Sequence, residues 1–319
     1  MPSCRHVIRA RDLSPADLHR IYDRATHFKN TSGTHVVPER PLAGHRIILC
    51  FYEASTRTRL SFAAAAQNLG ADIIGTENAA EFSSAIKGET PGDTARVLSG
   101  YGSLIVMRHP DITAVQQAAA VSQVPVINAG NGTDEHPTQA MLDLCTMWEC
   151  FGNTGKERTI TFVGDLARGR TVHSLLQLPA LYGGEFVRVR RVNLVAPKAY
   201  ELPPQLFWGA SRTFPDVQVH AALTPEALAE TDVLYMTRPQ RERNTSDVPL
   251  VDYGPFTLTP ELARALPEEA IIMHPLPRNS ELPTELDTDP RARYFEQSDN
   301  GLFVRMALLE FLLAPRSLE

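Results

Sequence analysis

The sequence predicts an α/β protein of two domains, each a parallel sheet with helices on both faces. Apolar runs of strand length alternate with helical segments over residues 46–273, an order that is typical of parallel sheets covered by helices. The chain has 319 residues, which is long for a single hydrophobic core. A polar segment with two glycines at residues 152–156 interrupts the alternation, as expected where one domain ends and another begins.

We expect the first domain at residues 1–138 and the second at residues 153–292. The segment from Pro137 to Trp148 is mostly apolar and predicts a long buried helix that joins the two domains. Another long helix is expected near the end of the chain, over about residues 296–319.

The elements of the first domain follow from caps and apolar runs. Ser14-Pro15-Ala16-Asp17 combines a cap residue, a proline at the first helical position and an acid in the first turn, which indicates a helix start. Thr90-Pro91-Gly92-Asp93 repeats this pattern. Short apolar runs predict buried strands at 46–51, 72–75, 103–107 and 124–128. Helices are expected at 14–27, 60–70, 90–100 and 111–121.

The second domain repeats the alternation. Apolar runs predict strands at 160–166, 191–196, 233–237 and 270–273. Helices are expected to begin near Arg170, near Thr224 and at Thr259. Residues 241–258 are polar and marked by proline and glycine, which predicts a mobile loop. Two prolines fix the turn at residues 274–278, so its backbone carbonyls can accept hydrogen bonds from an amine or amide.

Composition excludes several classes of function. The formal net charge is −6, which argues against a general nucleic-acid surface. The four cysteines form neither a Cys-x-x-Cys pair nor a Cys/His zinc spacing, so we expect no metal site and a reduced, cytoplasmic protein. No apolar stretch is long enough to predict a membrane span or a signal region.

The turn after the first strand has the composition of an anion site. Residues 55–59 read Ser-Thr-Arg-Thr-Arg between an apolar strand and an alanine-rich helix. A helix start leaves backbone N–H groups unpaired and carries partial positive charge, and hydroxyl and guanidinium groups add donors that fit phosphate oxygens. Arg108 also follows a strand, so it is expected to converge with Arg57 on one ligand. An ordinary helix cap with surface arginines is the alternative.

Two further segments stand out. Residues 76–88 form a long polar stretch, and such a loop in a compact domain is often functional, although composition alone favours a disordered surface loop. His136-Pro137-Thr138-Gln139 places His136 directly before the predicted joining helix, with Gln139 one turn in on the same face. By itself this pattern is weak, because a capping histidine is the better explanation of it.

Taken together, the Ser-Thr-Arg-Thr-Arg turn and the His-Pro-x-Gln segment resemble the two signatures of the aspartate and ornithine transcarbamoylase family. The resemblance extends over nearly the whole chain. It implies transfer of the carbamoyl group of carbamoyl phosphate to the amine of L-aspartate, giving N-carbamoyl-L-aspartate and phosphate, an early step of pyrimidine (UMP) biosynthesis. It implies no cofactor, and it implies that the last helix packs back on the first domain.

The resemblance also assigns roles to residues. The residues that act on the reacting carbamoyl group are Arg57, Thr58, Arg108 and His136. The residues that bind carbamoyl phosphate are Ser55, Thr56, Arg57, Thr58, Ser83, Lys87, Arg108, His136, Gln139, Leu276 and Pro277. The residues that bind aspartate are Lys87, Arg170, Arg238 and Gln240. In the family the polar loop reaches a neighbouring subunit's site, which implies a homotrimer with shared sites, and the spacing from Lys87 favours Ser83 over Ser84.

Two alternatives stay open. An ornithine transcarbamoylase shares both signatures, but its second substrate carries a side-chain cation, whereas Arg170 and Arg238 suit a dicarboxylate. A subunit that binds carbamoyl phosphate without turnover would also keep the fold. The sequence departs from the family at Ala63, where a glutamate is common, and at Ala167-Arg168 before Gly169. A regulatory chain or a dihydroorotase as partner, and any allosteric control, cannot be read from the sequence.

Overall fold

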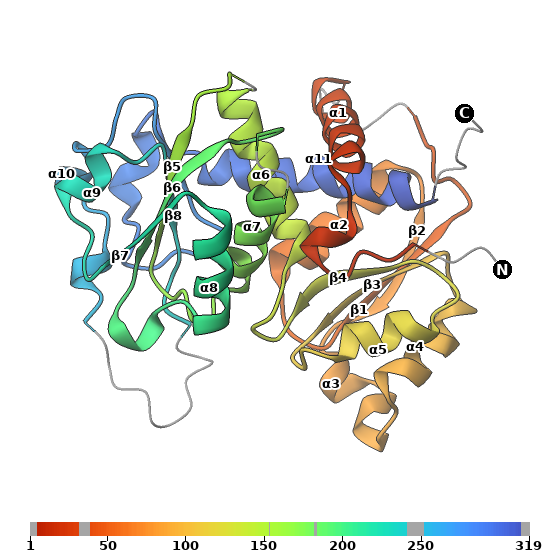
Figure 1. The fold of residues 1–319 in the computed structure, drawn as a ribbon. Coiled ribbons are helices and arrows are strands. Elements are labelled where there is room, and N and C mark those ends of the chain that lie inside the picture. The colour runs from red at the N-terminus through yellow and green to blue at the C-terminus, as the bar shows by residue number, and fades with distance from the viewer. Residues whose placement is uncertain (1–4, 32–38, 153, 182–183, 241–251, 314–319) are drawn as a thin grey trace. The chain divides into compact units, whose positions relative to one another are not determined.

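The structure, a computed structural model, describes residues 5–31, 39–152, 154–181, 184–240 and 252–313. It divides into two compact units (Figure 1). The first unit comprises residues 1–142 and 299–319, and the second comprises residues 143–298. Both divisions fall inside long helices, α6 (Pro137–Phe151) and α11 (Tyr294–Leu313).

The first unit is built on a four-stranded parallel sheet in the order β2-β1-β3-β4. Its strands are β1 (Arg46–Phe51), β2 (Asp72–Thr76), β3 (Leu104–His109) and β4 (Val126–Asn131). Its helices are α1 (Pro15–Thr31), α2 (Thr56–Asn68), α3 (Ala79–Phe82), α4 (Pro91–Ser99) and α5 (Ala114–Val121), with 3-10 turns η1 (Ala10–Asp12) and η2 (Ser84–Lys87).

Local sequence explains where these helices begin. Ser14 and Asp17 form the reciprocal cap expected at the start of α1, because Asp17 N donates to the Ser14 hydroxyl over 3.2 Å and Ser14 N donates to the Asp17 carboxylate over 2.8 Å. At α4 the Thr90 hydroxyl accepts from Asp93 N over 3.1 Å, with Pro91 at the first helical position. The sequence predictions for these two helix starts are therefore confirmed.

The second unit is built on a five-stranded parallel sheet in the order β7-β6-β5-β8-β9. Its strands are β5 (Arg158–Val163), β6 (Val189–Val195), β7 (Asp216–His220), β8 (Val233–Met236) and β9 (Ile271–Met273). Its helices are α7 (Arg170–Leu181), α8 (Pro204–Thr213), α9 (Pro225–Ala229) and α10 (Pro260–Ala263), with 3-10 turns η3 (Lys198–Tyr200), η5 (Gly254–Phe256) and η6 (Thr284–Thr288).

Each sheet has one point where the strand order reverses. In the first sheet β1 is followed by β2 on one side while β3 and β4 continue on the other, so the reversal lies between β1 and β3. In the second sheet it lies between β5 and β8. Open parallel sheets bind ligands beyond the carboxyl ends of the strands at such a point. The predicted fold class, parallel α/β in both units, is confirmed.

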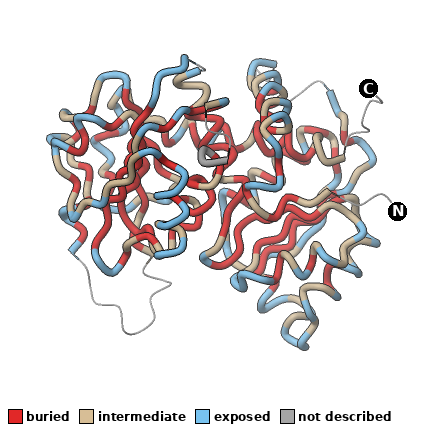
Figure 2. Tube along the Cα trace, in the orientation of Figure 1, coloured by how far each residue is buried: buried red, intermediate tan, exposed pale blue. Residues whose placement is uncertain are grey.

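Buried residues follow the central strands of both sheets (Figure 2). In the first unit one apolar cluster includes Ile48 of β1, Ile105 of β3 and Val126 of β4. In the second unit a cluster includes Leu234 of β8 and Ile272 of β9. Strands buried on both faces are the apolar runs that the sequence shows, since helices cover both sides of a parallel sheet.

Several elements differ from the sequence predictions. Strand β7 and helix α8 were not predicted, and α11 begins at Tyr294, two residues before the expected start near residue 296. The polar stretch 76–88 contains the short helix α3 and the turn η2 instead of being wholly irregular. Residues 241–251 of the predicted mobile loop, and residues 314–319 of the predicted last helix, lie outside the described residues. None of the helices in the described ranges is long and apolar enough to cross a membrane.

Candidate functional site

The Ser-Thr-Arg-Thr-Arg turn lies at the carboxyl end of β1, beside the reversal in the first sheet. Ser55 is the residue before α2, with extended backbone (φ −161°), and its side chain makes no capping hydrogen bond. The capping alternative is therefore not what the structure shows for this hydroxyl. Thr56 and Arg57 are exposed in the first turn of α2, while Thr58 is buried. Exposed donors at a helix start are suited to an anion.

Arg108 lies at the end of β3, directly beside this turn. It pairs in register with Phe51, and its carbonyl accepts a hydrogen bond from Tyr52 N over 2.8 Å. Its guanidinium group is buried, and it donates to the Glu53 carboxylate over 3.1 Å and to the Ala129 carbonyl over 3.3 Å. The planar fork is thus held in place at the strand reversal, as a phosphate ligand requires.

His136 stands at the start of α6 and faces the same turn. Its Nε2 lies 3.4 Å from the hydroxyl of Thr58, and both side chains are buried. The loop before it is fixed by buried side-chain amides. Asn131 Oδ1 accepts hydrogen bonds from Asn128 Nδ2 over 2.9 Å and from Glu135 N over 3.1 Å. The structure therefore brings the two sequence signatures together in the first unit. Gln139 follows one turn later and is partly exposed, with its N–H bonded to the His136 carbonyl over 3.0 Å.

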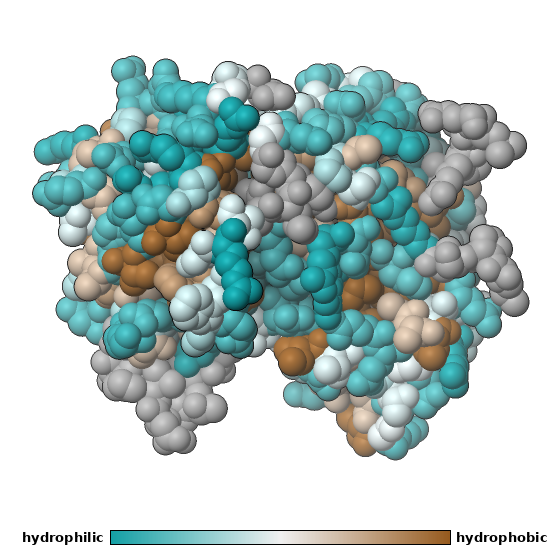
Figure 3. Space-filling model, viewed as in Figure 1, coloured by the Kyte–Doolittle hydropathy of each residue, from teal (hydrophilic) through white to brown (hydrophobic). Residues whose placement is uncertain are grey.

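Ser83 and Lys87 lie on the segment that follows β2. The Ser83 hydroxyl caps η2 by accepting from Ala85 N over 3.1 Å, while Lys87 is exposed at the end of that turn. Two large apolar side chains on the same segment are exposed, Phe82 by 76% and Ile86 by 67%. Brown apolar surface is visible at the lower tip of this unit in Figure 3, where the segment lies in Figure 1.

In the second unit a buried carboxylate joins the ends of β5 and β8. Asp165 is fully buried, and its two oxygens accept hydrogen bonds from Arg168 N over 3.0 Å and from Gln240 N over 3.1 Å. The side chain of Gln240 donates back to the Arg168 carbonyl over 3.0 Å. Arg168 itself lies 3.5 Å from the Asp165 carboxylate and stacks over the Tyr200 ring. The local variation at Arg168 therefore braces this turn.

Gly164 makes the close approach of these two turns possible. It has φ +118°, and a Cβ built there would lie 2.1 Å from the Thr237 carbonyl oxygen. Only glycine fits such a position without strain. The strand ends can then hydrogen-bond directly, with Thr237 N donating to the Val163 carbonyl over 2.8 Å.

The two predicted carboxylate-binding arginines follow these strands. Arg170 is the buried first residue of α7, and Arg238 is a half-buried residue that follows β8 and donates to the Pro239 carbonyl over 3.1 Å. Both lie beyond strands that flank the reversal in the second sheet. Local positive charge is thus concentrated there against the negative net charge of the chain.

The turn that follows β9 carries Leu276 and Pro277, joined by a cis peptide bond. Leu276 N donates to His274 Nδ1 over 2.8 Å, and His274 Nε2 lies 3.0 Å from the Glu281 carboxylate. Burial alone would raise the pKa of Glu281, but hydrogen bonds from His274 and from Asn279 N outweigh it, so the pKa lies below its usual value. The Glu281 side chain is therefore in its ionised, carboxylate form inside the second unit.

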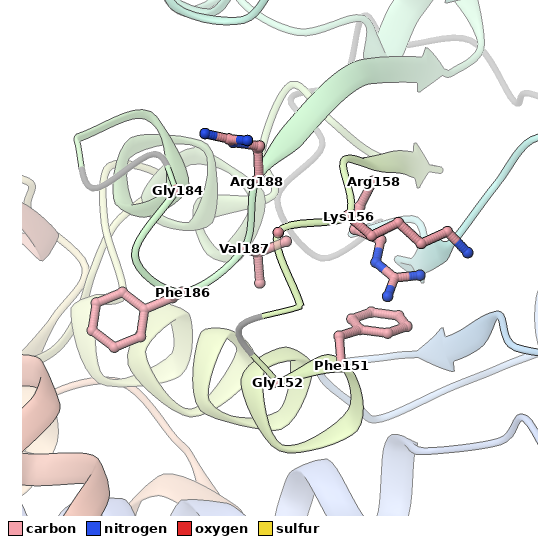
Figure 4. Close-up of a pocket in the computed structure, with 9 residues that line it drawn as sticks. Phe151, Gly152, Lys156, Arg158, Gly184, Phe186, Val187 and Arg188 are labelled. Atoms are coloured by element: carbon pink, nitrogen blue, oxygen red, sulfur yellow. The ribbon is translucent and has the colours of Figure 1, made fainter.

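A pocket of the second unit lies elsewhere (Figure 4). It is lined by residues from the end of α6 and from the segments that enter β5 and β6, including Lys156 and Arg158. These cations are paired, because Lys156 reaches Glu269 over 3.2 Å and Arg158 reaches Asp232 over 3.0 Å while lying over the Phe151 ring. The pocket is at the amino ends of the strands and contains none of the predicted site residues.

Sequence reasoning missed the acidic residues that hold the site side chains, namely Glu53, Asp165 and Glu281. Glu53 and Asp165 each lie two residues after a strand, whereas Glu281 lies eight residues after β9. Their partners are distant in the sequence or lie in irregular turns, so no local pattern identified these carboxylates. Over the described ranges, no three or more His, Cys, Asp or Glu side chains cluster in a way that could hold a metal ion.

Comparison with known families matches the two units separately. Residues 5–149 match the carbamoyl-phosphate-binding domain of aspartate/ornithine carbamoyltransferases, and residues 156–312 match the Asp/Orn-binding domain of the same enzymes. The chain is 42% identical over 279 residues to a chloroplastic aspartate carbamoyltransferase of Oryza sativa subsp. japonica, covering 87% of this chain and 75% of that protein. It is 43% identical over 310 residues to the multifunctional protein pyr-3 of Neurospora crassa, covering 97% of this chain but only 16% of that protein.

Solved structures agree. An aspartate transcarbamoylase of Trypanosoma cruzi, in complex with carbamoyl aspartate and phosphate, superposes with a TM-score of 0.87 at 38% identity, covering 96% of this chain and 94% of that one. The same enzyme in complex with carbamoyl phosphate gives a TM-score of 0.86. Both the fold and the sequence therefore point to one family.

Proposed function

The chain belongs to the aspartate/ornithine carbamoyltransferase family, and we propose on that premise that it transfers the carbamoyl group of carbamoyl phosphate to L-aspartate. The products are N-carbamoyl-L-aspartate and phosphate, which makes the reaction an early step of pyrimidine synthesis. Two relatives support the assignment to pyrimidine synthesis, the multifunctional protein pyr-3 and the multifunctional protein CAD of Squalus acanthias. The chain spans 13% of CAD. The observation that carries the proposal is the placement of cationic and donor side chains after strands that flank the reversal in each sheet.

In the first unit, we assign phosphate binding to Ser55, Thr56, Arg57 and Arg108, with Thr58 and His136 directed to the carbamoyl oxygen. The contact of 3.4 Å between Thr58 and His136 supports this, because it places the hydroxyl and the imidazole side by side. Attack by the aspartate amine turns the carbonyl oxygen into an oxyanion, and preorganised donors stabilise that charge. Gln139 and the Leu276 and Pro277 carbonyls are assigned to the carbamoyl NH2 group.

The bond changes balance without a cofactor. The amine nitrogen forms a C–N bond, the C–O bond to phosphate breaks, and the amine proton leaves with the phosphate, which is the strongest base that the reaction itself supplies. Together the substrates bring about four negative charges near neutral pH, and the assigned cations are Arg57, Lys87, Arg108, Arg170 and Arg238. Holding both reactants in place can lower the barrier by up to ~7–11 kcal/mol.

Aspartate is favoured over ornithine by charge. Arg170 and Arg238 both follow strands at the reversal of the second sheet. Two cations suit a second substrate with two carboxylates and repel the side-chain ammonium of ornithine. Gln240, held by Asp165 and Arg168, supplies a further donor beside them.

We also propose that the active unit is a homotrimer in which Ser83 and Lys87 complete a neighbour's site. The exposed Phe82 and Ile86 on the same segment support a protein partner, since large apolar side chains gather at interfaces. A reducing, cytoplasmic location is part of the proposal and is supported by Cys50, which is a buried thiol outside any disulfide.

Steady-state release of phosphate from carbamoyl phosphate tests the proposed activity. We expect release that saturates with L-aspartate and is lost in Arg57→Ala. Arg212→Ala is the matched control, because Arg212 is exposed on α8 and outside the assigned site. Tight binding of carbamoyl phosphate without any turnover would instead identify a binding subunit.

A further inference from the structure

We propose that His274 and Glu281 form a positioning pair that fixes the Leu276–Pro277 turn for recognition of the carbamoyl NH2 group. This inference rests on the proposed function, because it assumes that the Leu276 and Pro277 carbonyls accept hydrogen bonds from that group. Neither His274 nor Glu281 touches the reacting atoms in this account. Both act through the backbone of the turn.

The pair is buried and bonded at both ends of the turn. His274 is 1% exposed and Glu281 is fully buried. His274 Nδ1 accepts from Leu276 N over 2.8 Å, and its Nε2 lies 3.0 Å from Glu281 Oε1. The same carboxylate oxygen accepts from Asn279 N over 2.8 Å. One histidine and one glutamate thus bind backbone N–H groups on both sides of Pro277.

These contacts fix the tautomer of His274. Leu276 N can only donate, so Nδ1 of His274 must carry a lone pair and no proton. The ring proton therefore lies on Nε2 and points at the Glu281 carboxylate. A doubly protonated ring would set Nδ1–H against Leu276 N–H at 2.8 Å, which removes the bond. The neutral Nε2–H form is thus the one that holds the turn.

Leu276 requires such support because its backbone is strained. Its φ is +51°, in the left-handed region, and the other described non-glycine residue with positive φ is Asn78. Asparagine tolerates this region, whereas for leucine it is unfavourable. Strained backbone of this kind persists only where neighbouring contacts determine it, and it clusters at functional sites. The His274 bond to Leu276 N is such a contact.

The other side of His274 is anchored by a buried chain of hydrogen bonds. His274 N donates to the Gln297 side chain over 2.9 Å, and Gln297 donates to Asp143 over 2.6 Å. Tyr235 donates to the second Asp143 oxygen over 2.7 Å. All of these side chains are buried. Because α6, β8 and α11 each contribute one of them, the base of the turn is tied to three elements of the second unit.

Loss of the His274–Glu281 pair should affect the two substrates differently. If the pair sets the Leu276 and Pro277 carbonyls, its loss should weaken binding of carbamoyl phosphate more than binding of aspartate. Hydrogen bonds to charged groups are worth about 1.5–3 kcal/mol, which corresponds to a rise in KM for carbamoyl phosphate of about 10- to 150-fold. A role in stability alone would change both KM values or neither.

The experiment compares substitutions that keep or remove one bond at a time. Glu281→Met removes both bonds, and we expect the full rise in KM for carbamoyl phosphate with KM for aspartate changed by less than about threefold. Glu281→Gln keeps an acceptor at Oε1, so it should restore KM to within about threefold of the unmodified chain. His274→Asn keeps an acceptor near the position of Nδ1, so it should affect KM less than His274→Gln, whose polar group reaches toward Glu281 instead. If Glu281→Met does not fold, the comparison of His274→Asn with His274→Gln tests the positioning role instead.

Glu39→Met is the matched control, since Glu39 is exposed in the first unit, where it pairs with Arg24 and lies 3.6 Å from His27. Nitrogen-15 NMR of the imidazole rings in the full chain is a test that does not depend on turnover. It should show His274 as the neutral Nε2–H tautomer. An Nδ1–H or cationic ring, or an equal rise of both KM values in Glu281→Met, would overturn the proposal. Absence of turnover in the unmodified chain would contradict the proposed function. The NMR measurement would still show which ring nitrogen of His274 carries the proton.

Discussion

The hydroxyl of Thr58 lies 3.4 Å from Nε2 of His136, although 78 positions separate the two residues in the sequence. Thr58 belongs to the first turn of α2, and His136 stands directly before α6. The contact joins the two segments that the sequence singled out. It places a hydroxyl and an imidazole at the carboxyl ends of the central strands, where the proposed reaction needs donors for an oxyanion.

His136→Ala should lower kcat by about 10²- to 10³-fold, because removing one donor from an oxyanion site has an effect of that size. KM for aspartate should change little, since His136 is assigned to the carbamoyl oxygen. Steady-state kinetics with both substrates varied measures the split. His45→Ala is the control, because His45 precedes β1 at the other end of the same sheet. A loss confined to KM would show that His136 only binds substrate.

Arg238→Met should raise KM for aspartate at least about tenfold and leave KM for carbamoyl phosphate close to its original value. The substitution keeps most of the side-chain volume and removes the guanidinium group that we assign to a carboxylate. Arg212→Met on α8 provides the control for removal of one positive charge. An effect on carbamoyl phosphate instead of aspartate would mean that the second unit has been assigned to the wrong substrate.

Gly164→Ala should destabilise the chain by about 2–4 kcal/mol, since it adds a Cβ at positive φ and against a backbone carbonyl. Urea unfolding measures the free energy. Gly209→Ala is a stringent control because Gly209 lies within α8, with nothing within 4 Å of the added Cβ. That substitution should stabilise the helix by about 0.5–1 kcal/mol. Equal effects at both positions would refute the close approach of the ends of β5 and β8.

Asp17 should contribute a pH-dependent part of the stability of the first unit. Burial alone would raise its pKa, but hydrogen bonds from Arg5 and Ser14 outweigh this and lower the pKa to about 2. A folded-state pKa below the unfolded value of 3.8 means that the stabilisation is present above about pH 4 and is lost as the pH falls toward 2.

Unfolding of Asp17→Asn between pH 2 and pH 7 tests this window. We expect a deficit of about 1 kcal/mol at pH 7, discounted for solvent screening, which shrinks as the pH falls below 4. Asp23→Asn on the exposed side of α1 is the control. A deficit that stays constant down to pH 2 would assign the effect of Asp17 to its cap geometry rather than to its charge.

Shared sites predict complementation. Lys87→Ala and Arg57→Ala should each be nearly inactive, because each lacks a cation assigned to the site. In mixed trimers formed at equal ratio, about a quarter of the sites would combine an intact Arg57 with a neighbour's intact Lys87. Activity measured after mixing, dissociation and reassembly should rise to that level. No recovery at any ratio would place both residues in one subunit's site.

The sequence was most informative where periodicity is strong. Buried parallel strands such as β1 and β8 are continuous apolar runs, so they were predicted close to their observed bounds. Strand β7 was missed because it is an edge strand that alternates polar and apolar residues over 216–220 and is largely half-exposed. Helix α8 was missed because it begins at the second of two prolines, Pro204, and contains Gly209 and the exposed Trp208.

Within the candidate site, only the residues proposed to contact the substrates could be predicted from the sequence. Basic and hydroxyl residues after strands can be read from the sequence, because their position and chemistry are both local. The carboxylates that hold them have no such local pattern. Asp165 binds Gln240 across 75 positions, and Glu53 binds Arg108 across 55. These pairings depend on which strands become neighbours, and strand order is a property of the folded sheet.

The most direct test of the account is a competition between the two candidate amines. The purified full chain receives carbamoyl phosphate labelled with carbon-13 in its carbamoyl group, together with equal concentrations of L-aspartate and L-ornithine, and the labelled products are resolved by NMR. We predict that N-carbamoyl-L-aspartate forms and that labelled carbamoyl-ornithine (citrulline) does not. Formation of the ornithine product in place of the aspartate product would contradict the assignment of Arg170 and Arg238 and, with it, the proposed function.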